Sequence, residues 1–123
     1  MSENRELNVG VLGAGGIIAP AIVRDLAESE EVGDLLLLDV ELARAEKVAS
    51  EHGGAAARVA EVDAREGLAD ALDGVDVLVN SASYRINLDA MRACLAAGCN
   101  AYFGKPISPK ELLRKLPGLL SSA

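Results

Sequence analysis

The sequence predicts an α/β protein with three layers, in which a sheet of five parallel strands is covered by helices on both faces. Three observations support this fold class. Short apolar runs alternate along the chain with longer segments of helical period, as in repeated strand–helix units. The run Leu35–Leu38 is apolar without a break, which is typical of a parallel strand covered on both faces. The glycine-rich segment Gly13–Gly16 joins the first apolar run to the first helical pattern.

The first half of the chain is predicted to contain two strand–helix units. The apolar run Leu7–Leu12 forms the first strand, and the helix Gly16–Glu28 follows it. Pro20 fits this assignment only near the helix start, where the amides have no partner within the helix. The second unit joins the strand Leu35–Leu38 to a helix at Glu41–Glu51, and the glycines that follow end this helix.

The second half repeats the alternation. Its expected elements are a strand at Arg58–Val62, a helix at Ala64–Leu72, a strand at Val75–Val79, a helix at Asn87–Ala97 that ends at Gly98, and a strand at Ala101–Phe103. A last helix is expected after Ser108, because Ser108 can cap it, Pro109 suits the first helical position and Glu111 completes a capping box.

Composition and charge limit the classes of function. The 123 residues suffice for one domain, and 50% hydrophobic with 25% charged residues is ordinary for a globular protein. A net charge of -7 disfavours nucleic acid and anionic membranes as partners, because both require a basic surface. The N-terminus is polar and no apolar run approaches bilayer length. We therefore expect a cytoplasmic protein that is a monomer or a weak homo-oligomer.

Residues that bind transition metals are few. Cys94 and Cys99 fall within and just after a predicted helix, among alanines, and are interpreted as small buried residues. His52 is the only histidine, and the spacing of the cysteines does not suggest zinc. We expect no metal site.

The glycine segment and Asp39 together indicate dinucleotide binding. Gly13 lets the chain turn sharply out of the strand, and Gly15 lets a pyrophosphate approach the backbone N–H groups at the helix start. Asp39 lies about 20 residues beyond the loop, at the end of the next apolar run, where a carboxylate accepts hydrogen bonds from the adenosine ribose. The third glycine of the usual spacing is replaced by Ile18. The alternative is a tight turn that binds no ligand.

Two strand orders suit five parallel strands. In the Rossmann-like order 3-2-1-4-5 the ligand crevice lies between strands one and four, whereas the flavodoxin-like order 2-1-3-4-5 places it between strands one and three. The glycine segment and Asp39 favour the first order.

From about Asn8 to Asn100 the chain resembles the N-terminal, nucleotide-binding part of the saccharopine dehydrogenase family of oxidoreductases. The resemblance is carried by Val11–Gly16, Asp39 with Ala43–Ala45, Val62–Arg65, Gly74–Asn80, and Tyr84–Leu88 through Met91, Cys94 and Gly98. It implies that the amides of Ala14, Gly15, Gly16 and Ile17 hold the pyrophosphate, that Asp39 binds the adenosine ribose, that Asp63 accepts the adenine amino group, and that Asn80, Ser81 and Ala82 line the path toward the nicotinamide.

Some of these assignments have alternatives. Asp63 also suits a solvated cap of the third helix, and Asn80 a strand-end amide that satisfies loop backbone groups. Asp39 favours NAD over NADP, because a carboxylate repels a 2′-phosphate and the next residue is Val40 rather than arginine. Arg44, one helical turn further on, argues for NADP.

The chain departs from this resemblance after Cys99. Residues 98–113 instead resemble the last strand and helix of response-regulator receiver domains, with Lys105–Pro106 at the matching strand end. We therefore expect one domain over residues 1–123, of the saccharopine dehydrogenase type over 1–99 and receiver-like over 100–123, joined in an engineered or recombined chimera. A natural protein with a coincidental Lys-Pro pair is the alternative.

The expected function is NAD(P) binding without catalysis by this chain alone, because the family's substrate domain is not expected in it. Tyr84, Arg85 and Lys105 are interpreted as loop or surface residues. One alternative is a scaffold that binds no ligand. Another is a receiver-like phosphoacceptor using Asp63, Ser81 and Lys105, but strand one offers glycines where the magnesium ligands of a receiver would be.

Overall fold

The computed structural model describes residues 7–16, 19–54, 57–63, 66–82, 86–99, 101–103 and 114. Its elements are β1 (Leu7–Leu12), α1 (Ala19–Glu28), β2 (Val32–Asp39), α2 (Leu42–Val48), the π-helical turn η1 (Ala49–Gly53), β3 (Ala57–Glu61), α3 (Leu68–Ala71), β4 (Val77–Asn80), α4 (Asn87–Ala97) and β5 (Ala101–Phe103).

The five strands form one parallel sheet in the order β3-β2-β1-β4-β5. This confirms the predicted fold class and the Rossmann-like strand order. At the end of the central strand, Leu12 is in register with Leu38 of β2 and with Asn80 of β4. The carboxyl ends of β1, β2 and β4 therefore meet at one edge of the sheet, where the chain enters the glycine segment.

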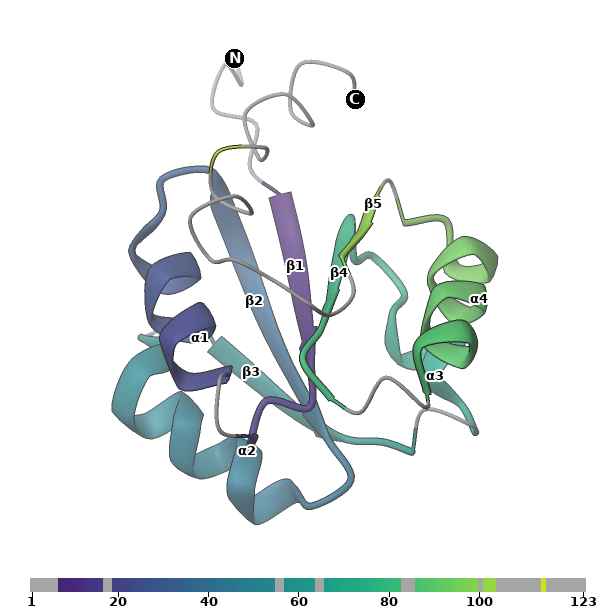
Figure 1. Cartoon of the computed structure of the whole chain (residues 1–123). Helices are drawn as coiled ribbons and strands as arrows, with labels where there is room; N and C mark the ends of the chain where they lie inside the picture. Colours follow the sequence, from purple (N-terminus) through teal and green to yellow (C-terminus); the bar gives the residue numbers. More distant parts are fainter. Residues whose placement is uncertain are drawn as a thin grey trace.

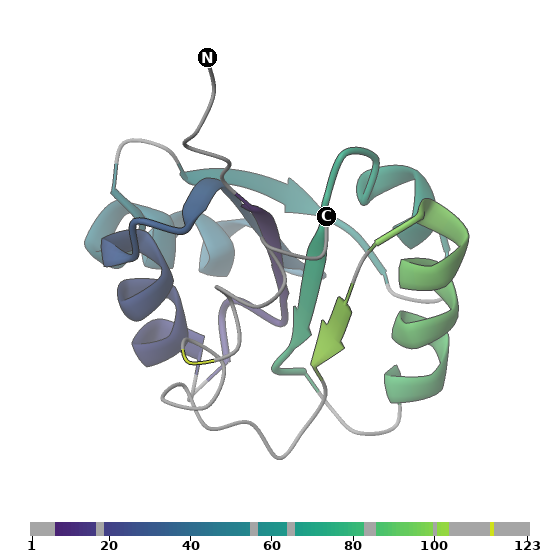
Figure 2. The same cartoon turned by 90° about the horizontal axis from the view of Figure 1, so that it is seen from above.

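Helices cover both faces of the sheet, with α1 and α2 on one face and α3 and α4 on the other (Figures 1 and 2). Alternate residues of β2 point to opposite layers. Leu35 and Leu37 belong to the same apolar cluster as Ile22 of α1, whereas Leu36 and Leu38 pack in the cluster that includes Leu68 of α3. Because each face of the strand is covered, the whole run had to be apolar, as the sequence predicted.

Two helices begin later than predicted. Helix α1 is described from Ala19, and Gly16, the predicted start, lies in a turn where its N–H donates to the Gly13 carbonyl (3.0 Å). Pro20 is thus in the first turn of α1, where it was expected. Helix α3 starts at Leu68 rather than Ala64, and the left-handed Gly67 (φ +75°) precedes it.

Strand and helix ends elsewhere differ by a few residues. Strand β4 starts at Val77 rather than Val75. Just before it, the Asp76 N–H donates to the Asn8 carbonyl (2.8 Å) and the Asp76 carboxylate accepts from the Asn8 N–H (2.9 Å). Val75 is nevertheless 5% exposed, so its apolar character predicted burial but not strand pairing. Helix α2 ends at Val48 and continues as η1. Strand β2 is longer than its apolar run at both ends, β3 is shifted by one residue, and α4 and β5 have the predicted bounds.

The expected last helix, with Ser108, Pro109 and Glu111, lies outside the described residues, as does the Lys105–Pro106 pair. Arg114 is described and is helical and exposed. No helix in the described part of the chain is long and apolar enough to cross a membrane.

Candidate functional site

The glycine turn after β1 fits against the end of β4. Gly13 has φ +77°, and a Cβ placed on it would lie 2.7 Å from the backbone N and Cα of Ala82. Both the left-handed backbone and the close approach of Ala82, just after β4, therefore require glycine at this position. The N–H groups of Gly13 and Ala14 donate to the Leu38 carbonyl (2.7 and 3.1 Å), which fixes the turn to β2 as well.

Asp39, the last residue of β2, lies beside this turn. Its Oδ2 accepts a hydrogen bond from the Gly15 N–H (2.9 Å), and its Oδ1 accepts one from the Glu41 N–H (2.9 Å). Its side chain lines a hollow at the sheet edge although the residue is only 8% exposed. The structure thus brings together the two features, glycine turn and strand-end carboxylate, that the sequence singled out.

Gly15 is also close to the start of α2. A Cβ on Gly15 would lie 2.4 Å from the Cβ of Arg44 and 3.0 Å from Oδ2 of Asp39. The sequence interpretation explained this glycine by the approach of a phosphate. The structure adds a second reason, because helix α2 packs against the loop at this point.

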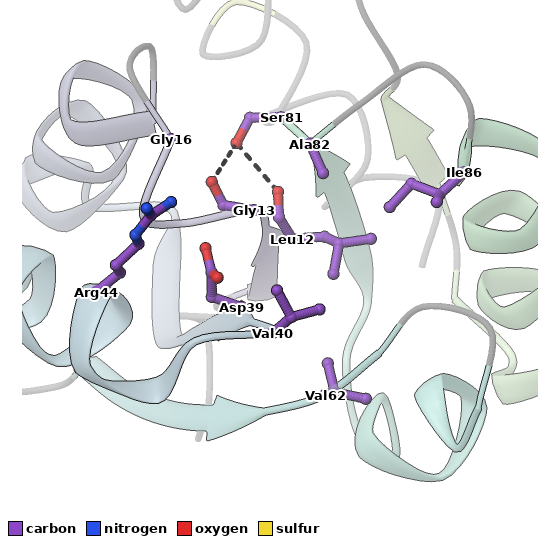
Figure 3. A pocket seen from close by; sticks show the side chains of 10 residues that line it. All are labelled: Leu12, Gly13, Gly16, Asp39, Val40, Arg44, Val62, Ser81, Ala82 and Ile86. Atoms are coloured by element: carbon purple, nitrogen blue, oxygen red, sulfur yellow. Dashed lines mark hydrogen bonds between the residues drawn. The ribbon is translucent and has the colours of Figure 1, made fainter.

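Two polar residues at the end of β4 are hydrogen-bonded within the protein. The Ser81 hydroxyl lies 3.0 Å from the Leu12 carbonyl and 3.2 Å from the Gly13 carbonyl, so it holds the turn to β4 (Figure 3). Asn80 is 1% exposed; its Nδ2 donates to the Tyr102 hydroxyl (3.1 Å) and its Oδ1 accepts from the Ala82 N–H (2.9 Å). The bond to Ala82 is the loop contact that the alternative interpretation of Asn80 expected.

A hollow of about 220 Å³ lies over these residues (Figure 3). Figure 3 shows Asp39 and Arg44 on one side of it and Ala82 and Ile86 on the other. It is lined by Leu12, Gly13, Gly16, Asp39, Val40, Arg44, Val62, Ser81, Ala82 and Ile86. The lining combines a backbone turn, the polar residues Asp39, Arg44 and Ser81, and several apolar side chains.

A second hollow, of about 520 Å³, adjoins the first along the carboxyl end of β3. Val40 and Val62 line both hollows, so the two form a continuous surface. Val40 is 58% exposed there, and the exposed Asp63 lies further along the second hollow. Val40 and Val62 had no binding role predicted from the sequence. Their position was the available signal, since each is adjacent to a predicted acidic site residue.

Arg44 is the cation of the first hollow. Its Nε lies 3.1 Å from Oε1 of Glu41, one helical turn earlier, and its side chain is 63% exposed. Ile17, which the sequence assigned to the pyrophosphate, lies outside the described residues, as do Tyr84, Arg85 and Lys105. Among the residues that the structure describes, no group of three or more His, Cys, Asp or Glu side chains could hold a metal ion.

Comparison with known families identifies the domain. The family described as the saccharopine dehydrogenase NADP binding domain matches residues 9–102. The chain belongs to this family. It is an NAD(P)-binding domain of the saccharopine dehydrogenase type, as the sequence resemblance implied. The match extends three residues beyond Cys99 into β5, so it includes Ala101 and Tyr102. The receiver-like segment and the chimera remain predictions.

Solved structures share the fold of this saccharopine dehydrogenase-type domain. An apo saccharopine dehydrogenase (L-Glu forming) from Saccharomyces cerevisiae is 22% identical with a TM-score of 0.70, over 89% of this chain and 24% of the yeast chain. A putative D-mannonate oxidoreductase from Haemophilus influenza with bound NAD is 26% identical with a TM-score of 0.54, over 65% of this chain and 33% of that one. An Escherichia coli NADPH-dependent quinone oxidoreductase complexed with NADPH is 18% identical with a TM-score of 0.64, over 93% and 44%. The chain thus spans about a quarter of the length of the yeast enzyme.

Proposed function

We propose that this domain binds NAD in the crevice at the carboxyl ends of β1, β2 and β4, with Asp39 reading the adenosine ribose. One observation carries the proposal: the Asp39 carboxylate lies 2.9 Å from the Gly15 N–H, so the acidic group and the glycine turn form one surface. A dinucleotide needs both at once, because its ribose hydroxyls and its pyrophosphate are only a few bonds apart.

Asp39 retains capacity to accept ribose hydrogen bonds. An ionised carboxylate has about four lone-pair directions, and the two N–H groups that reach Asp39 use one on each oxygen. The ribose hydroxyls are donors suited to the remaining ones. Val40 and Val62 offer apolar surface to the adenine ring, and Asp63, further along the same surface, is the proposed acceptor for the adenine amino group.

The pyrophosphate is proposed to lie at the glycine turn, near the amides of Ala14, Gly15, Gly16 and Ile17. Helix α1 follows this turn, and its first turn has no acidic residue, so no carboxylate there opposes the favourable dipole. The amides of Ala14, Gly15 and Gly16 donate to Leu38, Asp39 and Gly13, respectively. A phosphate oxygen would share these donors or replace an internal acceptor. The nicotinamide half is proposed to extend toward Asn80, Ser81 and Ala82.

We propose NAD rather than NADP as the preferred dinucleotide. A 2′-phosphate bound near the ribose would be repelled by the Asp39 carboxylate. Arg44 is close enough to line the same hollow, but its guanidinium is paired with Glu41 at 3.1 Å, which offsets its charge. When bound, the dinucleotide carries the hydride in such reactions, and the protein supplies binding and orientation. Binding is the role proposed for these residues.

Isothermal titration of the full chain with NAD and with NADP tests this proposal. Asp39→Asn keeps the side-chain shape and removes the charge, so we expect NAD affinity to fall by about tenfold, in line with the loss of a charged hydrogen bond. Asp34→Asn is the matched control, because Asp34 lies on the same strand and outside both hollows. Its NAD affinity should be unchanged.

Two results would contradict the proposal. One is no measurable NAD binding by the wild-type chain, which would support a scaffold without a ligand. The other is equal NAD affinity in the Asp39→Asn and Asp34→Asn variants, which would show that Asp39 does not contact the ribose. Circular dichroism of each variant checks that the fold is retained.

A further inference from the structure

Helix α4 ends in a motif that brings two particular side chains together. Gly98 is left-handed (φ +85°), its N–H donates to the Leu95 carbonyl (3.2 Å), and the Cys99 N–H donates to the Cys94 carbonyl (3.0 Å). These are the two hydrogen bonds of a Schellman motif. In that motif the side chains of the first and last residues pack against each other across the turn. Here both residues are cysteines.

The two thiols are in contact at the edge of the core. Both side chains pack in the apolar cluster between the sheet and α4. Cys94 is 2% exposed and sits in the apolar cluster with Leu78, whereas Cys99 is half-buried at its margin. The Cys94 thiol donates to the Ala101 carbonyl (3.4 Å).

We propose that Cys94 and Cys99 form a dithiol site that a low-molecular-weight disulfide converts to an intramolecular disulfide in the folded domain. The chain contains two cysteines, so these are its only candidates for an intramolecular bond. The two cysteines are five positions apart in sequence, and the Schellman motif closes the backbone turn between them. The folded chain therefore loses less conformational entropy on forming the disulfide than a flexible chain would. This inference is independent of nucleotide binding.

The reaction begins at the more accessible sulfur. The Cys99 thiolate attacks one sulfur of the external disulfide, which forms a mixed disulfide and releases one thiolate of the reagent. Cys94 then loses its proton to solvent, and its thiolate attacks the Cys99 sulfur, which forms the Cys94–Cys99 bond and releases the second reagent thiolate. Two protein thiols are oxidised, and one external disulfide is reduced to two thiols.

The charges around the pair favour this order. The neighbouring Cys94 thiol lowers the pKa of the Cys99 thiol, although burial and the Asp76 carboxylate act in the opposite direction. The neighbouring Cys99 thiol and burial raise the pKa of Cys94. Cys99 is therefore the thiol that ionises first, and it is also the one that the external disulfide reaches.

Glutathione disulfide added to the full reduced chain tests the proposal. After the reaction is quenched with N-ethylmaleimide, intact mass spectrometry should show a monomer that has lost two hydrogen atoms and carries no maleimide. In Cys94→Ser the reaction should stop at a stable glutathione adduct on Cys99. In Cys99→Ser the buried Cys94 should form its adduct at least about tenfold more slowly, since disulfide exchange depends on access to the thiolate.

A denatured control separates the folded geometry from mere proximity in sequence. The equilibrium constant for forming the disulfide with glutathione should be at least about tenfold larger in the native chain than in the chain unfolded by urea. Equal or smaller values in the native chain would overturn the proposal. Native wild-type protein that remains reduced, accumulates glutathione adducts or forms an intermolecular disulfide would overturn it as well.

Discussion

The carboxyl ends of β2 and β4 flank the same glycine turn, but their polar side chains serve it differently. On the β2 side, Asp39 accepts from backbone N–H groups and keeps acceptor capacity toward the hollow. On the β4 side, the Ser81 hydroxyl lies within hydrogen-bond distance of the Leu12 and Gly13 carbonyls. The Asn80 amide joins the Ala82 N–H to the Tyr102 hydroxyl on β5. The β2 side is thus suited to reading a ligand, and the β4 side to holding the turn in place.

Substitutions on the β4 side should therefore mainly lower the free energy of unfolding, and those on the β2 side should mainly change the affinity for the nucleotide. The largest expected effect is at the contact between the turn and β4. Gly13→Ala forces a Cβ into the Ala82 backbone in a left-handed conformation, so we expect a loss of about 3 kcal/mol or more in the free energy of unfolding. Urea denaturation followed by circular dichroism measures it.

Gly74→Ala is the control for that variant. Gly74 also has a positive φ (+84°), but nothing lies within 4 Å of the added Cβ. It should lose only the conformational part, about 1–2 kcal/mol. Equal losses in the two variants would show that the approach of Ala82 is not what demands glycine at the turn.

The ratio of NADP to NAD affinity is expected to change with substitutions on the β2 side and not with those on the β4 side. Glu41→Gln removes the carboxylate that pairs with Arg44 at 3.1 Å. A 2′-phosphate could then compete for the guanidinium, so the ratio of NADP to NAD affinity should rise by up to about fivefold, the range expected for an exposed charge pair. Titrations with both nucleotides give this ratio.

Arg44→Ala sharpens the same comparison. Without the guanidinium, the affinity for NADP should fall relative to that for NAD. If neither Glu41→Gln nor Arg44→Ala changes the ratio, Arg44 has no part in discrimination at the ribose.

On the β4 side, Tyr102→Phe should lower stability at neutral pH by about 1 kcal/mol, because Asn80 loses a hydrogen-bond acceptor. The effect should also depend on pH. Burial raises the pKa of Tyr102 above its ordinary value of 10.0, although the hydrogen bond from Asn80 offsets part of this.

The sign of that pH dependence follows from the order of ionisation: as the pH rises, Tyr102 ionises in the unfolded chain before it does so in the folded chain. The stability that neutral Tyr102 contributes is complete below about pH 10 and is lost as the pH rises through the folded pKa. Denaturation of wild type and Tyr102→Phe between neutral and alkaline pH measures it. A stability difference that does not shrink at alkaline pH would contradict the account.

The sequence predicted the placement of the glycine turn and Asp39 better than the contacts that support them. The proximity of the turn to Asp39 could be predicted because a turn needing glycine and a carboxylate at a strand end leave signals in the residue types themselves. The strand order followed from where such a ligand would have to lie. The bounds of α4 and β5 were predicted correctly. The end of α4 was clear because the left-handed Gly98 follows it.

The contacts that the sequence missed depend on the packing of distant elements. The approach of Ala82 to Gly13 and of Arg44 to Gly15 follows from how closely α2 and β4 pack on the turn. The Asn80–Tyr102 hydrogen bond joins neighbouring strands. Cys94 and Cys99 were interpreted as small buried residues, which Cys94 is, but the hydrogen bond from the Cys99 N–H to the Cys94 carbonyl depends on the Gly98 turn.

Nitrogen-15 NMR spectra of the chain during a titration with NAD test the central claim most directly. If Asp39 and the glycine turn form the binding surface, the amide signals of Gly15, Asp39 and Val40 should shift most as NAD is added, while those of Cys94 and Leu95 on α4 stay in place. Saturable binding that leaves the Gly15 and Asp39 amides unmoved would contradict the claim, as would the absence of any binding.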